Sequence, residues 1–211
     1  MIISRRIYGL SSLFVVLMFI VMRIGLILAD QPDSQSASEK WSYFEFKPGQ
    51  FFKYKLTSER GLEGWVSVKV EDGGSGAFNV TLAGNWMGEF SETAKLEPGT
   101  APMDFVYSVE NFQIPNAMGS LLMVDSEIIQ NVTWKDGFKW VQGDKSIEVS
   151  GTQEYAGIQG LVMTYTSTHF ATKKVQKKIF CVNPELSLPL YLQCPAANDT
   201  WSYELIEVTG R

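Results

Sequence analysis

The chain has 211 residues, of which 45% are hydrophobic, enough to build the core of one domain. Arg5, Arg6 and Arg23 are three of its 18 basic residues, so the sequence from residue 30 onward holds 15 basic against 23 acidic residues, a net charge of −8. Nucleic-acid binding requires clustered Lys and Arg, so this acidic composition argues against it.

Residues 1–29 form an apolar segment that predicts export from the cytoplasm. The 23 residues from Ile7 to Ala29 would extend about 34 Å as a helix, which matches a bilayer core. Arg5 and Arg6 favour a cytoplasmic N-terminus. Arg23 lies near the far end of the segment, where its side chain can reach the membrane interface. We therefore expect this segment to contact the membrane.

Two alternatives stay open for this segment: a retained signal anchor, or a signal peptide that is cleaved after Ala29. Residues 30–40 are polar and lack an apolar period, which predicts a flexible linker. Residues 41–211 are then expected to form an extracytoplasmic domain, either tethered to the cell membrane or secreted.

Sequons and cysteines agree with export. The sequence contains three N-glycosylation sequons, which begin at Asn79, Asn131 and Asn198. In an oxidising compartment, Cys181 and Cys194 are predicted to form a disulfide, with two unrelated buried thiols as the alternative. No metal site is expected, because two thiolates and the single histidine, His169, do not make a ligand set.

Three early segments alternate apolar and polar residues with a period of two, which is typical of strands with one buried face. Their apolar positions are Phe52, Tyr54, Leu56, Val66, Val68, Val70, Phe78, Val80 and Leu82. Later strands are expected at 104–109, 129–134, 138–142, 145–150, 161–170, 174–182, 188–193 and 201–208. Because strand follows strand, the predicted fold is all-β with one or two short helices, as a curved antiparallel sheet or incomplete β-barrel.

Two stretches interrupt this pattern. Residues 84–103 mix polar and apolar residues and contain two prolines, so no strand is expected there. Residues 115–130 have apolar residues at roughly helical spacing after Asn116, a suitable N-cap. This segment is predicted to be a short helix over one end of the sheet, or a mobile lid over an apolar cavity.

No catalytic motif is visible, and we expect neither enzymatic activity nor a cofactor. The sequence has no Gly-x-Ser-x-Gly elbow, phosphate-binding loop, dinucleotide fingerprint or His-Glu-x-x-His. A carboxylate pair from distant strands stays an open alternative, with Glu45, Glu89, Glu92 and Asp104 as the scattered acids. The basic cluster Lys173, Lys174, Lys177 and Lys178 is either a solvated strand face or a contact with an anionic surface.

Six tryptophans are interpreted as core residues, or as part of an apolar pocket or a carbohydrate-stacking surface. Trp65 is predicted to lie on the strand face opposite Val66, Val68 and Val70. If that face is exposed, Trp65 is a better binding candidate than its neighbours.

The segment KKIFCVNPELSLPLYLQC, residues 177–194, indicates a strand, a turn at Asn183-Pro184 and a strand opened by Leu188-Pro189-Leu190. It resembles a pattern in periplasmic lipoprotein-carrier proteins (LolA/LprG-like). FEFKPGQFFKYKL, residues 44–56, is similar to the first hairpin of such proteins. The resemblance implies an incomplete antiparallel barrel wrapped around a helix, with an apolar cavity that takes acyl chains. The sequons, the cysteine pair and the single helical candidate depart from that pattern.

Two functions compete. The first is a non-catalytic binding domain that holds a lipid-like or apolar ligand against the nine apolar strand residues above, closed by Met118, Leu121 and Leu122. A solidly packed interior is the alternative for the same residues. The second function is a membrane-anchored accessory or cell-surface structural subunit that makes protein–protein contacts through its sheet.

Overall fold

The computed structural model describes residue 41 and residues 43–86, 88–100, 132–168, 172–196 and 199–210, all within the compact unit Ser38–Arg211. Several predicted features lie outside these ranges: the segment 1–29, the linker 30–40, the strand at 104–109, the helix at 115–130 with Met118, Leu121 and Leu122, and Asp104, Asn131, His169 and Asn198. A search of the described residues finds no helix with the length and apolar character needed to cross a membrane.

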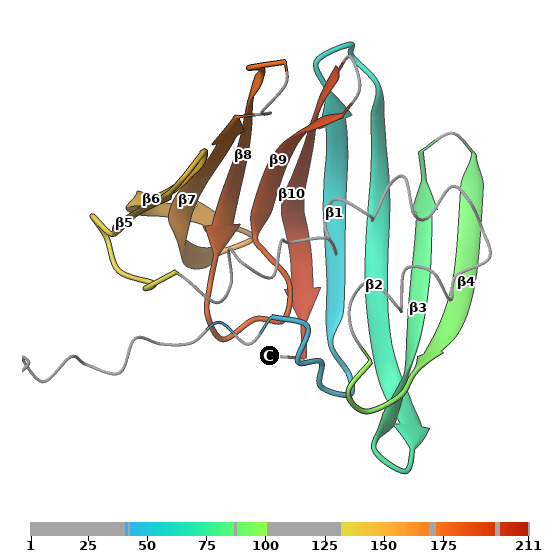
Figure 1. The fold of residues 1–211 in the computed structure, drawn as a ribbon. Helices are drawn as coiled ribbons and strands as arrows, with labels where there is room; N and C mark the ends of the chain where they lie inside the picture. Colours follow the sequence, from blue (N-terminus) through green and yellow to red (C-terminus); the bar gives the residue numbers. More distant parts are fainter. Residues whose placement is uncertain are drawn as a thin grey trace, which may run out of the picture. The chain divides into compact units, whose positions relative to one another are not determined.

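The described residues form one open, curved antiparallel sheet of ten strands and contain no helix (Figure 1). This confirms the predicted all-β antiparallel fold. The strands are β1 (Phe51–Ser58), β2 (Glu63–Gly74), β3 (Ala77–Asn85), β4 (Glu89–Leu96), β5 (Lys139–Gln142), β6 (Lys145–Tyr155), β7 (Ile158–Thr168), β8 (Val175–Val182), β9 (Tyr191–Ala196) and β10 (Asp199–Thr209).

The strand order is β4-β3-β2-β1-β10-β9-β8-β7-β6-β5. Each strand therefore pairs with its neighbour in sequence, except where β1 pairs with β10 in the middle of the sheet. Figure 1 shows these two strands, near the start and the end of the described chain, lying side by side. The sheet thus consists of two meanders, β1–β4 and β5–β10, joined by one long-range antiparallel pair.

One face of the sheet, which we call the inner face, carries the core. Residues directly opposite each other on paired strands share a face, so the register defines a row of apolar side chains across six strands. Every member of this row is at most 2% exposed: Leu56, Tyr203, Leu192, Phe180, Met163 and Val149. Each fully buried side chain of this kind stabilises the fold by about 1.5–3 kcal/mol.

Two details of the predicted strands are wrong. β4 lies inside residues 84–103, where no strand was expected; its Phe90 and Leu96 are buried, but Glu92 occupies an inner-face position and breaks the apolar alternation. Conversely, the described end of the strand expected at 129–134, residues 132–134, is not in a strand.

The predicted disulfide is also wrong, because no disulfide joins Cys181 to Cys194. Cys181 lies directly opposite Tyr191, and Cys194 follows three residues later on β9 without a register shift. An odd separation along a strand places side chains on opposite faces, and three residues of strand extend roughly 10 Å. A disulfide requires Cα atoms within about 7 Å. The alternative of two unrelated buried thiols fits this structure.

Candidate functional site

The nine apolar residues predicted to line a cavity lie in the core. Eight of them are at most 1% exposed, and Phe78 is half-buried. The pairing of β1, β2 and β3 brings these residues together: Tyr54 lies directly opposite Val66, and Val68 lies directly opposite Leu82. The register thus unites the predicted set on the inner face, while its three closing residues lie outside the described ranges.

Trp41 and residues 43–50 lie against the loop 183–190, and both contribute to the core. We call this contact the terminal clasp. Hydrogen bonds link the segments: Trp41 Nε1 donates to Leu186 O (2.7 Å), Phe44 N donates to Ser187 O (2.8 Å), and the single Ser187 hydroxyl hydrogen is shared between Glu45 O (2.7 Å) and Gln50 Oε1 (3.2 Å) as acceptors. From β1, the buried Tyr54 hydroxyl donates to Pro189 O at 2.8 Å. These bonds satisfy polar groups that would destabilise the folded state if they were buried without a partner.

Local chemistry shapes both sides of the terminal clasp. Pro48 and Gly49 occupy the central positions of a turn in which Gln50 N donates to Lys47 O, and Gly49 has a φ of 85°, as a type II turn requires. On the other side, Asn183 Oδ1 accepts from Glu185 N at 3.0 Å, which confirms the turn predicted at Asn183-Pro184. The hairpin expected over 44–56 is wrong, because its first arm is not a strand.

The opposite side of the sheet, which we call the outer face, is polar and exposed around Trp65. The indole is 37% exposed, as required for the binding candidate predicted from the sequence. Lys53 Nζ lies 5.1 Å from its ring centroid, close enough for a cation–π interaction that orients the indole. Trp65 thus presents an aromatic surface from the middle of one half of the sheet.

Trp65 belongs to a row that crosses five strands on the outer face. The register places each member directly opposite the next, and all five side chains are exposed. We call this set the Trp65 row: Glu204 on β10, Lys55 on β1, Trp65 on β2, Asn85 on β3 and Glu89 on β4. It combines donors, acceptors and one aromatic ring on a continuous sheet.

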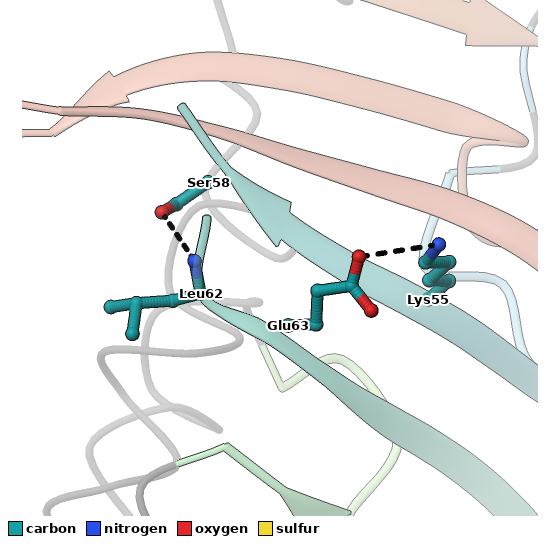
Figure 2. Close-up of polar contacts among 4 residues, drawn as sticks. All are labelled: Lys55, Ser58, Leu62 and Glu63. Atoms are coloured by element: carbon teal, nitrogen blue, oxygen red, sulfur yellow. Dashed lines mark hydrogen bonds and ion pairs between the residues drawn. The ribbon is translucent and has the colours of Figure 1, made fainter. Parts of the chain in front are cut away.

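Ion pairs hold the charged side chains near this row. Lys55 Nζ lies 3.8 Å from Glu63 Oε1, across the reversal between β1 and β2, and Figure 2 shows this pair beside the bond from Leu62 N to Ser58 Oγ. Because these side chains are exposed, each pair contributes only about 0.2–1 kcal/mol. Their main effect is to balance charge on this surface.

Small residues border the Trp65 row. The next row along β2, β3 and β4 consists of Ser67, Ala83 and Ser91. Beyond it, Thr81 and Thr93 are linked through their hydroxyl groups at 2.8 Å. Trp65 is therefore a large side chain next to a row of short ones, and 37% of its surface is exposed.

A second group of side chains lies where β6 approaches β8 and β9. The rings of Tyr155 and Tyr191 stack at 5.2 Å, and Cys181 Sγ donates to Gln153 O at 3.7 Å. Burial raises the pKa of the Cys181 thiol from 9.0 to about 11. Burial first, then the nearby Cys181, Tyr191 and Glu204, raise the pKa of Tyr155 to about 12. Cys181 is therefore protonated at neutral pH and is a weak nucleophile.

The remaining sequence candidates lie apart. Glu89 and Glu92 are three residues apart on β4 and so lie on opposite faces, while Glu45 belongs to the terminal clasp. The described residues contain no group of three or more His, Cys, Asp or Glu that could hold a metal ion. Asn79 is half-buried on the outer face of β3, and the cluster of four lysines lies in and just before β8, largely exposed.

Sequence reasoning found Trp65 but missed the other members of its row. Lys55, Asn85, Glu89 and Glu204 come from four different strands, and no local pattern relates them. The signal that would find them is the strand register. The pairings β1–β2, β2–β3 and β3–β4 align Lys55, Asn85 and Glu89 with Trp65, and only Glu204 depends on the long-range pairing of β1 with β10.

No protein-family model matches this chain, and no curated protein matches it either. The resemblance to lipoprotein carriers therefore stays a prediction. Among solved structures, the hypothetical lipoprotein YmcC from Escherichia coli aligns with 90% of this chain and 96% of its own length, at 14% sequence identity and a TM-score of 0.34. At that TM-score we draw no conclusion about shared fold or function.

Proposed function

We propose that this protein is an extracytoplasmic, non-catalytic binding domain that contacts its partner through the outer face of the sheet. The observation that carries this proposal is the contrast between the two faces. An empty cavity wide enough for an acyl chain would leave accessible surface on its lining side chains. Eight of the nine inner-face candidates have at most 1% of their surface accessible, whereas Trp65 is exposed on the outer face.

The location outside the cytoplasm is part of the proposal and rests on the N-terminal segment and the sequons. An exposed tryptophan surrounded by polar residues is a common centre of recognition surfaces, because tryptophan combines a large apolar area with few rotatable bonds. A rigid sheet also holds such a residue in one position, so little conformational entropy is lost on binding.

Thiol labelling on intact cells tests this proposal. Cys181 and Cys194 are buried, so a single introduced cysteine gives a clean signal. Ser91→Cys places a thiol beside the Trp65 row, and Val141→Cys, at a position 74% exposed on β5, is the matched control. The full-length protein, made in its native cells, is treated with a membrane-impermeant maleimide and compared with the purified protein.

We expect both variants to react on intact cells, with Ser91→Cys slowed relative to purified protein and Val141→Cys unchanged. Failure of both variants to react on intact cells would refute the extracytoplasmic location. Equal reactivity of Ser91→Cys on cells and after purification would refute binding through the outer face.

Lipid binding on the inner face is the second candidate function. It is favoured by the continuous row of apolar side chains across six strands, which gives an acyl chain a matching surface if the core opens. Native mass spectrometry of the gently purified full-length protein tests it. A stoichiometric co-purifying lipid would support this function over contact through the outer face.

A further inference from the structure

The outer face raises the question of which chemical class of partner the Trp65 row fits. Within the row, the indole is flanked on one side by Lys55 and Glu204 and on the other by Asn85 and Glu89. A lysine donates hydrogen bonds, carboxylates accept them and an amide does both. A matching ligand therefore has an apolar patch for the ring and groups that both donate and accept on either side of it.

We propose that the Trp65 row is a binding site for a neutral, linear glycan that lies across the strands; this inference rests on the proposed function of the outer face. A pyranose ring presents C–H groups on one face, and these pack against the electron-rich face of an indole. Its hydroxyl groups both donate and accept, so they match the amide, ammonium and carboxylate groups on either side of Trp65.

The spacing of the row fits a chain of sugar rings. Adjacent strands lie about 4.8 Å apart, close to the length of one pyranose ring, so a linear glycan perpendicular to the strands would place one ring over each strand. One ring would stack on the face of the Trp65 indole that Lys53 Nζ does not cover, and its neighbours would lie over Lys55 and Asn85.

Charge complementarity favours a neutral ligand. Around the indole, the positive charges of Lys53 and Lys55 are offset by Glu63, Glu89 and Glu204, which leaves a net charge of only −1 among these five residues. Farther along the same face, Lys69 and Lys95 are paired with Glu71 and Glu97 at 2.8 and 2.7 Å. A strongly anionic glycan would meet three carboxylates beside the ring, and a strongly cationic partner would meet two ammonium groups. A neutral glycan experiences neither of these like-charge repulsions.

The same composition argues against a protein partner at this row. The centre of a protein interface is depleted of charged residues and contains several apolar or aromatic side chains. The Trp65 row has one aromatic residue and three charged ones. A protein partner is therefore the competing outcome of the test.

The test measures binding of cellohexaose, chitohexaose and xylohexaose, three neutral linear glycans, to the purified full-length protein by calorimetry and tryptophan fluorescence. Hexagalacturonate serves as the anionic control. We expect at least one neutral hexasaccharide to bind and the anionic one to bind at least about tenfold more weakly. Trp65→Ala should weaken binding by about tenfold or more, the usual effect of removing a central aromatic contact, and Trp65→Phe should retain most of it.

Ile206→Ala is the matched control, because Ile206 is an exposed apolar residue on β10 that is not a member of the row. It should bind as the wild type does, and circular dichroism should show that all three variants are folded. Absence of binding to all three neutral glycans, or unchanged binding by Trp65→Ala, would overturn the glycan site. If no glycan binds but Ser91→Cys is protected on cells, the proposed function stands and the partner is a protein. If Ser91→Cys is not protected either, both the glycan site and the proposed binding through the outer face are refuted.

Discussion

Tyr54→Phe tests the hydrogen bond by which β1 holds the loop 183–190 of the terminal clasp. The Tyr54 side chain is fully buried and its hydroxyl donates to the buried Pro189 carbonyl at 2.8 Å. Phenylalanine keeps the ring and removes one oxygen, so the carbonyl loses this donor away from water. We expect the free energy of unfolding at pH 7 to fall by about 1–3 kcal/mol. Urea unfolding followed by tryptophan fluorescence measures it, with Tyr191→Phe as a control at a half-buried hydroxyl, where the loss should be smaller.

The same variant has a pH signature. Burial raises the pKa of Tyr54 well above its ordinary value of 10.0, so above pH 10 the folded protein keeps a proton that the unfolded chain loses. Wild-type stability then falls with rising pH by about 1.4 kcal/mol per pH unit for this group, and Tyr54→Phe lacks that fall. Cys181 and Tyr155 also have raised pKa values, but they contribute equally to both proteins. The difference in stability should therefore shrink between pH 10 and 11; a constant difference would refute the burial of this hydroxyl.

The remaining predictions concern the thiols, one glycine and the terminal clasp. Alkylation in denaturant without reductant should modify both cysteines, as seen by mass spectrometry; protection that disappears only after reduction would contradict the register of β8 and β9. Gly84→Ala should destabilise the fold by about 1–3 kcal/mol in thermal unfolding, because its Cβ would lie 2.5 Å from Phe90 Cζ and 2.6 Å from Trp65 O. Trp41→Phe should cost about 1–3 kcal/mol in urea unfolding, since it removes the donor to Leu186 O; wild-type stability would contradict the clasp.

The inner face could be predicted from the sequence because strand alternation is local. The alternation of Phe52, Tyr54 and Leu56 with polar residues predicts a buried strand face from only five residues, and all three side chains are buried in the structure. β4 was missed because Glu92 occupies one of its inner-face positions, so the alternation in that edge strand is incomplete. A charged residue on an edge strand also discourages pairing with other chains, a requirement that competes with a clean apolar pattern.

The placement of the cysteines and of the candidate site depends on strand register, which alternation along one strand does not reveal. Cys181 and Cys194 are close in sequence, yet the register of β8 and β9 puts them on opposite faces. The clasp residue Ser187 bonds with Glu45, 142 residues earlier in the chain. No local propensity encodes the contact between Ser187 and Glu45, which joins the segment before β1 to the loop before β9 and accompanies the pairing of β1 with β10.

The pairing of β1 with β10 sets an order of events during biosynthesis. β10 is synthesised after β2–β9, so the side of β1 that pairs with β10 waits without its final hydrogen-bond partners until β10 arrives. An unpaired strand edge is prone to join the wrong chain. The meander β1–β4 must therefore exist for a time as one half of the sheet, with the free edge of β1 exposed. A polypeptide truncated before Asp199 would lack β10 and keep this edge open, so that it recruits another copy or a chaperone.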